Sequence, residues 1–240
     1  MIKKAISIII PAYNEEKYLL EALKSVAYQT FNHSQLEVIV VDNASTDNTA
    51  AVHQNFFKNH PTQHLLLKEP QLSPGKAKNT GAEKAQGEIL LFLDADTKMS
   101  PQTVQEVDYW YKKGFLMGTI RITADSSDIV AKFFFDLLNF GKTIFNIACH
   151  MVFCQKQLFF QVEGFNPELK HAEDLDFCRK VKKALKRRGK SWCMIHNAPV
   201  ATSTRRMIRH PLKLGYLITL LEWGFGGFLG FRRKQYIPYR

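Results

Sequence analysis

The sequence predicts an α/β protein with a mostly parallel sheet flanked by helices. Residues 5–111 alternate short apolar runs with helix patterns, which is the order that a parallel sheet with crossover helices requires. The runs are continuously apolar, as expected for strands that are covered on both faces. Polar residues follow the runs, and ligands bind beyond the carboxyl ends of such strands.

The first two strands are expected at Ala5–Ile10, which Pro11 ends, and at Glu37–Val41. Asn14 is expected to cap the helix after the first strand, because acidic residues follow it where the helix dipole favours them. Three residues can cap the helix after the second strand: Ser45, Thr46 or Asp47.

Two more strand and helix units complete this region. A short strand is expected at Leu65–Leu67, and Ser73-Pro74 carries the capping and proline signals of a helix start. A central strand at Ile89–Leu93 follows, and Ser100-Pro101 begins a helix that runs to about Tyr111.

The central strand ends in two carboxylates, Asp94 and Asp96. A strand alternates its side chains, so these two carboxylates are expected to point the same way and repel each other, and a divalent cation is the usual relief. Mg²⁺ is typically held by one or two carboxylates together with substrate phosphates. The alternative is a pair of solvated loop aspartates, with Asp96 near a helix N-cap.

The pattern changes after Gly114. Strands are expected at Phe115–Ile122 and Met151–Phe153. Residues 128–148 predict one or two helices with more apolar surface than one buried stripe needs, so this segment is either a core helix or an apolar surface for something outside.

A further helix is expected from about His171 to Arg188, with acids at its start and bases at its end, which plain helix electrostatics would also explain. Two short strands are expected at Trp192–Ile195 and Pro199–Ala201.

The net charge of +11 is unevenly distributed. Residues 1–167 carry 16 Lys and Arg against 17 Asp and Glu, whereas residues 168–240 carry 17 against 5. Such asymmetry points to an anionic partner: phosphates, a nucleic acid or an anionic membrane surface. The four cysteines show no zinc-site spacing and are too sparse for a disulfide framework, so free thiols in a reducing compartment are expected. The apolar run at Ala5–Ile10 is too short for a signal sequence.

Residues 204–240 are predicted to form a basic, partly hydrophobic helical extension. Its apolar stretch, Leu212–Phe231, is flanked by basic residues but contains Glu222, and a central charge costs about 2.5–3.5 kcal/mol in a bilayer. Interfacial binding to an anionic membrane is therefore expected, with a cytoplasmic protein peripheral on the inner face of the cytoplasmic membrane. The alternative is an amphipathic helix packed on its own domain or on a second subunit.

Five motifs in this order resemble the inverting GT-A glycosyltransferases of family 2. Together they cover about residues 5–185: Ser7–Glu16, Val40–Asp47, Ala77–Gly81 followed by Ala85–Glu88, Asp94–Asp96, and Glu173-Asp174.

The resemblance implies a GT-A, Rossmann-like catalytic domain over residues 1–203, with a nucleotide-sugar-binding half at 1–112 and an acceptor-side half at 113–203. The donor would be a nucleotide sugar, with UDP- or GDP-sugars expected, and Mg²⁺ or Mn²⁺ would neutralise its diphosphate.

The resemblance also implies roles for individual residues. Asp96 would bind the metal, Asp94 would bind the ribose or a metal-bound water, and Asp42 would contact the base. Lys78 would help to hold the donor; it stands where the family usually has Arg, which keeps the charge but loses the bidentate fork. The nucleoside pocket would be lined by Pro11, Tyr13 and Glu15.

On the acceptor side, Asp174 matches the family's catalytic base, with Asp176 as the nearby competitor. Arg205 and Arg206 would steady the departing diphosphate. His196 would be a third metal ligand, although a histidine in such a position is more often structural.

No Q-x-x-R-W segment of the processive synthases occurs, so transfer of a single sugar is favoured. The apolar 128–148 segment and the basic tail indicate a lipid-linked or cell-envelope glycan acceptor. One alternative is an RNA-binding module, but the basic run Lys180–Arg188 contains no aromatic residue and no nucleic-acid partner is expected. The other is an inactive nucleotide-sugar-binding protein, against which the intact Asp94, Asp96 and Asp174 argue.

Overall fold

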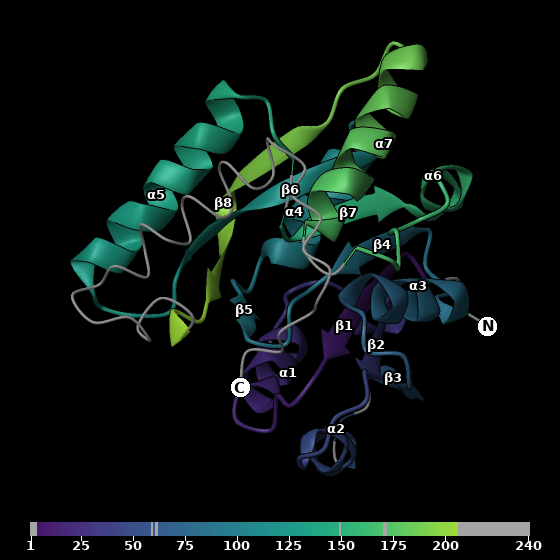
Figure 1. Ribbon diagram of the computed structural model, residues 1–240, viewed down its shortest axis with the longest axis vertical. Helices are drawn as coiled ribbons and strands as arrows, with labels where there is room; N and C mark the ends of the chain where they lie inside the picture. Colours follow the sequence, from purple (N-terminus) through teal and green to yellow (C-terminus); the bar gives the residue numbers. More distant parts are fainter. Residues whose placement is uncertain (1–3, 59, 61, 149, 170–171, 206–240) are drawn as a thin grey trace.

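The computed structural model describes residues 4–58, 60, 62–148, 150–169 and 172–205, and Figure 1 shows their arrangement. In this part of the chain, eight strands form one sheet in the order β3-β2-β1-β4-β7-β6-β8-β5. The strands are β1 (Ile6–Ala12), β2 (Leu36–Asp42), β3 (Gln63–Lys68), β4 (Ile89–Phe92), β5 (Thr97–Met99), β6 (Met117–Ala124), β7 (Val152–Gln155) and β8 (Cys193–Thr202). The helices are α1 (Leu19–Ala27), η1 (His33–Gln35), α2 (Thr49–Phe57), α3 (Pro74–Lys84), α4 (Thr103–Lys112), α5 (Ile129–Ile144), α6 (Lys156–Gln161) and α7 (Glu173–Arg187).

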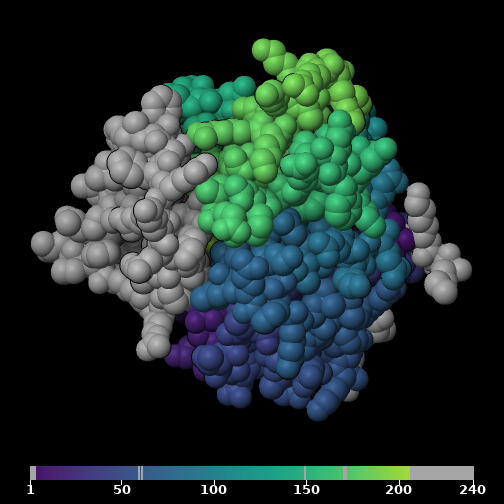
Figure 2. All heavy atoms as spheres, turned by 45° about the vertical axis from the view of Figure 1, so that its right-hand side comes forward, coloured from purple at the N-terminus to yellow at the C-terminus, as the bar shows by residue number. Residues whose placement is uncertain are grey.

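The predicted fold class is confirmed. Strands β1 to β4 pair in parallel with one another, and β6 also runs parallel to β8. The sheet is mixed in its second half, because β7 is antiparallel to β4 and β6, and β5 is antiparallel to β8. In the space-filling view, the purple and blue first half of the chain and the green second half occupy opposite ends of the molecule (Figure 2). The predicted division into catalytic halves stays a prediction.

Alternation along the central strands divides the core between the two faces of the sheet. Ile8 of β1 packs in a cluster with residues of α1, α4 and α5. Ile9, its neighbour in the chain, packs in a second cluster with residues of α3, α6 and α7. Both faces of β1 are therefore buried, which explains its continuous apolar sequence.

Several sequence expectations about local structure are wrong. Helix α1 begins at Leu19 and has Tyr18 at its N-cap position, so Asn14 does not cap it. Asn14 instead has a positive φ of 54° and lies in the loop after β1. The two short strands expected near residues 192–201 are one strand, β8, which changes register against β6 between Ile120 and Ile122.

The expected start of α3 at Ser73-Pro74 is confirmed. Ser73 caps α3 by accepting a hydrogen bond from the backbone N–H of Lys76. The N-cap residue of α2 is Asn48, without a side-chain cap hydrogen bond, so the expectation that Ser45, Thr46 or Asp47 caps this helix is wrong. Asp47 precedes the cap, and its Oδ1 accepts a hydrogen bond from the N–H of Thr49, the first residue of α2. Cys154, Cys178 and Cys193, the cysteines of the described region, are buried and are not joined to one another by disulfides. Among the described residues, no helix has both the length and the apolarity needed to cross a membrane. The predicted tail lies outside the described residues except for Thr204 and Arg205.

Candidate active site

The loops after β1 and β2 are locked together at the carboxyl edge of the sheet. Asn14 Oδ1 accepts a hydrogen bond from the backbone N–H of Thr46 at 2.8 Å, and the Asn14 N–H donates to Ser45 Oγ at 3.0 Å. The backbone N–H of Glu15 donates to Thr49 Oγ1 at 2.8 Å. Because β1 and β2 are adjacent and parallel, both loops emerge side by side, and the bonds fix the backbone that carries Glu15.

The predicted nucleoside-pocket residues lie at this same edge. Pro11 belongs to β1 and Tyr13 follows it, and both are half-buried. Asp42 is the last residue of β2, where its Oδ1 accepts a hydrogen bond from the N–H of Ser45 at 3.1 Å. The structure thus brings Pro11, Tyr13, Glu15 and Asp42 to two neighbouring strand ends.

The two carboxylates after β4 lie in a turn. β4 ends at Phe92, and the N–H of Thr97 donates to the carbonyl of Asp94 at 3.0 Å before β5 begins. Strand alternation therefore does not extend to this pair. Asp94 is exposed, whereas only 8% of the Asp96 side chain is accessible, so the two carboxylates have different surroundings.

Arg205 joins three of the predicted site segments. Its guanidinium makes a bidentate pair with the carboxylate of Glu15, with one bond of 2.8 Å, and lies 3.1 Å from Asp96 Oδ2. It also stacks over the ring of Tyr18, 4.4 Å from the centroid. Burial by itself lowers the pKa of Arg205, but the neighbouring carboxylates of Glu15 and Asp96 together have a larger effect, so the pKa of Arg205 is raised. Arg205 follows β8 and thus brings together the loop after β1 and the Asp94–Thr97 turn.

Lys78 of α3 lies beside the two acids of the E-D motif. Its Nζ lies 2.6 Å from Asp174 Oδ1 and 3.0 Å from Glu173 Oε1, and it stacks over Phe165 at 4.9 Å. Burial lowers the pKa of Lys78, but the charges of Asp174, Glu173 and Asp94 more than compensate and raise it. Lys78 is therefore a buried ammonium ion whose direct partners are the two acids of the E-D motif.

Asp174 lies in the first turn of α7, where the positive end of the helix dipole favours a carboxylate. Burial raises the pKa of Asp174, but the charges of Lys78, His150 and Lys142 outweigh it and hold the pKa below its ordinary value. The side chain is 20% accessible. It is therefore an ionised carboxylate that is reachable from solvent. The competitor Asp176 instead pairs with Lys180, one turn further along α7, at 3.1 Å.

Helix α3 also anchors the loop that leads to α7. The Asn79 side chain donates to the carbonyl of Phe165 at 2.8 Å and accepts from its N–H at 3.0 Å. Ser73 Oγ donates to the carbonyl of Pro167 at 2.9 Å. The loop turns at Gly164, which has a φ of 58°. Helix α3 and its cap residue thus hold the loop before α7 by bonds to its backbone, and Lys78 bonds Asp174 directly.

The family model described as "Glycosyl transferase family 2" matches residues 7–156, which include the loops after β1, β2 and β4. The chain belongs to glycosyl transferase family 2. The predicted membership is therefore confirmed.

Two relatives illustrate how far the similarity extends. The poly(ribitol-phosphate) beta-N-acetylglucosaminyltransferase TarS of Staphylococcus aureus is 36% identical over 100 residues, which are 42% of this chain and 18% of that protein. The glycosyltransferase AglE of Haloferax volcanii is 37% identical over 100 residues, 42% of this chain and 33% of that protein. The matches thus span a third or less of these relatives.

Solved structures confirm the GT-A fold. TarS residues 1–349 of S. aureus in complex with UDP-GlcNAc match with a TM-score of 0.63 and 29% identity, over 74% of this chain and 53% of that one. The mannosyltransferase PcManGT of Pyrobaculum calidifontis, in complex with GDP-Man and Mn²⁺, matches with a TM-score of 0.67. At 20% identity over 92% of this chain and 65% of that one, this second likeness concerns the fold alone.

The structure of this family 2 protein does not bring His196 to the predicted metal site. Thr202 of β8 lies opposite Thr97, next to Asp96, whereas His196 is exposed six residues earlier in the strand. Within the described residues, no three His, Cys, Asp or Glu side chains are grouped to hold a metal ion. Two carboxylates still suit Mg²⁺ or Mn²⁺ when substrate phosphates supply further oxygens. Asp94 and Asp96 therefore fit a partial ligand set. Arg206 lies outside the described residues.

Sequence reasoning missed several residues of the site. Glu173 was named only as half of the E-D motif, yet it binds Lys78 directly. Lys142 and His150 lower the pKa of Asp174, but they come from segments whose pattern indicates only an apolar helix and a strand. Tyr18, under Arg205, precedes an ordinary amphipathic helix and carries no separate signal.

Proposed function

We propose that this family 2 protein transfers one sugar from a nucleotide-diphosphate sugar to an acceptor hydroxyl with inversion, in a metal-dependent reaction. The observation that carries the proposal is the ionised, partly accessible Asp174, held by Lys78 beside the sheet edge that carries Asp42, Asp94 and Asp96. An inverting transfer needs a base on the acceptor side and an anion-stabilising site on the donor side. The chain supplies candidates for both.

On the donor side, Asp42 and the loop after β1 would hold the nucleoside, and Asp94 and Asp96 would hold Mg²⁺ or Mn²⁺. The bound cation would neutralise charge that develops on the leaving diphosphate. Arg205 already contacts Asp96, so its guanidinium is placed to share that carboxylate or to turn toward the diphosphate. UDP- and GDP-sugars are the expected donors, and complexes of TarS with UDP-GlcNAc and of PcManGT with GDP-Man support that choice.

On the acceptor side, Asp174 would accept the proton of the attacking hydroxyl. Its lowered pKa keeps it ionised at neutral pH, and Lys78 limits its rotation. We propose a lipid-linked or cell-envelope glycan as the acceptor. Relatives whose names contain poly(ribitol-phosphate), teichuronic acid and chondroitin support an acceptor of this kind. The basic tail would keep the protein, in the cytoplasm, at the inner face of the cytoplasmic membrane.

A thermal-shift screen of UDP-, GDP- and dTDP-sugars, with and without Mn²⁺, tests the donor half of the proposal. A ligand that binds only the folded state at about 100 times its Kd stabilises the protein by ~2.7 kcal/mol. One sugar nucleotide should raise the melting temperature in a Mn²⁺-dependent manner, and Asp96→Asn should remove the metal-dependent part. No shift with any donor, combined with a steeply salt-dependent affinity for RNA, would instead support an RNA-binding module. Donor binding without transfer to any acceptor would identify an inactive nucleotide-sugar-binding protein.

A further inference from the structure

Helix α5 has an apolar face that points into solvent. Its inner face packs into the core through Ala131, Phe134 and Phe135. Five further apolar residues recur every three or four positions and therefore share one outer face of the helix. These outer residues, the α5 stripe, are Ile129 (81% exposed), Phe133 (69%), Leu137 (44%), Phe140 (64%) and Ile144 (60%).

A basic groove lies between the second half of α7 and the start of β8. It has a volume of about 540 Å³, and its walls carry four lysines and no acidic residue. Trp192 is held in the groove by a hydrogen bond from its Nε1 to Asn146 Oδ1 at 2.7 Å, with Lys182 Nζ 5.5 Å from its ring centroid. The four residues that we call the groove lysines are Lys182, Lys183, Lys186 and Lys190.

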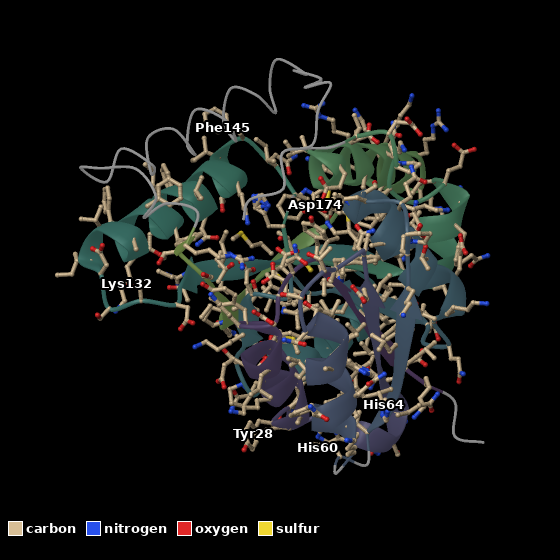
Figure 3. The ribbon with its side chains drawn as sticks, turned by 60° about the horizontal axis from the view of Figure 1, so that its bottom comes forward. Tyr28, His60, His64, Lys132, Phe145 and Asp174 are labelled. Atoms are coloured by element: carbon tan, nitrogen blue, oxygen red, sulfur yellow. The ribbon has the colours of Figure 1, made fainter. Side chains whose placement is uncertain are left out.

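The α5 stripe ends at the rim of this groove. Asn146, which lines the groove, directly follows Phe145, which caps α5 and is 72% exposed. Thr143 in the last turn of α5 contacts Met194, another groove residue, at 3.8 Å. Figure 3 shows Phe145 at the end of α5 nearer to α7, with Lys132 toward the other end. Apolar and basic surfaces are therefore neighbours.

We propose that the α5 stripe and the basic groove together bind the surface of an anionic phospholipid bilayer. Phosphate headgroups would enter the groove, and the stripe would lie against the acyl chains. An apolar helix face bordered by lysines is the usual composition of an interfacial surface, and each lysine near anionic lipid adds to the attraction. This inference rests on the proposed function. It adds to that function the surface that would bring the transferase to a membrane-bound acceptor.

Charge complementarity favours the bilayer over protein occupants of this surface. Residues 206–240 could cover the stripe, but they carry seven Lys and Arg against one acid, Glu222, and so offer nothing to the groove lysines. A second copy of the chain brings a net charge of +11. An anionic bilayer complements both the α5 stripe, through its acyl chains, and the groove lysines, through its phosphate headgroups. Lys182 lies eight residues after Asp174 on α7, about 12 Å at the helical rise, so an acceptor in the bilayer would be near the candidate base.

Vesicle flotation of the full chain tests the proposal. Binding should be at least about tenfold stronger to vesicles of equal parts phosphatidylcholine and phosphatidylglycerol than to phosphatidylcholine alone. The double variant Lys183→Glu/Lys186→Glu should lose that preference, because both side chains are exposed and line the groove. Lys58→Glu/Lys84→Glu changes the net charge equally at exposed positions outside the groove, and should keep it. If the first variant fails to fold, Lys190→Glu replaces it.

The stripe is tested separately. Phe133→Ser/Phe140→Ser should reduce vesicle binding, whereas the matched variant Tyr28→Ser/Tyr109→Ser, also exposed, should not. Three results would overturn the proposal. The first is equal binding of the protein to both vesicle types. The second is a stripe variant that is less stable but still binds vesicles, which would indicate that residues 206–240 cover the stripe, and the third is a stripe variant whose only change is dissociation of a dimer. The nucleotide-sugar thermal shift is measured on every variant. If the unaltered protein shows no thermal shift with any nucleotide sugar, the proposed function is refuted. If it shows the shift but does not bind vesicles, only this inference is refuted.

Discussion

Lys78 Nζ and Asp174 Oδ1 lie 2.6 Å apart, although 96 residues separate them in the sequence. The contact joins α3 to the first turn of α7, which carries the candidate base. Because both groups are largely buried, neither can lose the other without leaving a charge that water does not fully solvate. The pair therefore links the stability of the fold to the ionisation of Asp174, the candidate base.

Replacing Lys78 by Met should destabilise the protein by about 3–5 kcal/mol, since it breaks a buried ion pair and leaves Asp174 and Glu173 facing each other. The pKa of Asp174 should rise, because the charge that lowers it is gone. The acid limb of kcat/KM should move to higher pH. Denaturant unfolding and a pH–rate profile measure the two effects.

Lys78→Arg is the matched control, because it keeps the positive charge. Its pH–rate profile should stay close to that of the unaltered protein, even if the larger guanidinium lowers stability. A Met variant whose acid limb does not move would contradict the assignment of Asp174 as the group that titrates in the profile.

Asp174→Asn should severely slow sugar transfer and spare donor binding. The amide cannot accept the proton of the acceptor hydroxyl, while Asp42, Asp94 and Asp96 are unchanged. General-base removal typically lowers the rate by about 10²–10⁴-fold. Transfer assays and the donor-induced thermal shift separate the two properties. Asp176→Asn, which changes the carboxylate paired with Lys180, is the comparison, and a larger rate loss there would move the base to Asp176.

Arg205→Gln should strengthen Mn²⁺ binding in the absence of donor. The guanidinium and a metal ion compete for the carboxylate of Asp96, which Arg205 approaches to 3.1 Å. The same variant should weaken binding of the sugar nucleotide, if Arg205 turns to the diphosphate. Calorimetric titration with Mn²⁺ alone and with donor measures both. Weaker Mn²⁺ binding in the variant would show that Arg205 supports the metal site rather than competing with it.

The sequence predicted the β1–β4 half of the fold well, because buried parallel strands are continuous apolar runs and their carboxyl ends carry the polar site residues. It missed β5 and α6, which have three and six residues and are too short for a period to emerge. Arg205 and Glu15 are 190 residues apart in the sequence, so their contact could not be predicted from any local sequence pattern. Alternation also failed at Asp94 and Asp96, because the chain leaves the strand at Phe92.

The buried His53, which is not part of the candidate active site, is expected to make the protein less stable in acid. It lies on α2 with a 3% exposed side chain, and neither ring nitrogen has a hydrogen-bond partner among the described residues. Burial, with the nearby charge of His64, lowers the pKa of His53 to about 4. The unfolded chain takes up a proton near pH 6.5, whereas the folded chain does not until about pH 4, so stability falls as the pH drops between these values.

By pH 5 this difference amounts to about 2 kcal/mol, at 1.36 kcal/mol for each pKa unit crossed. His53→Leu removes the proton acceptor and keeps an apolar side chain, so its free energy of unfolding should change by about 2 kcal/mol less than that of the unaltered protein between pH 7.5 and 5. Urea unfolding at both pH values measures the difference. His196→Gln, an exposed histidine on β8, is the control variant. If His53→Leu and the unaltered protein lose the same stability, the acid sensitivity arises at other groups.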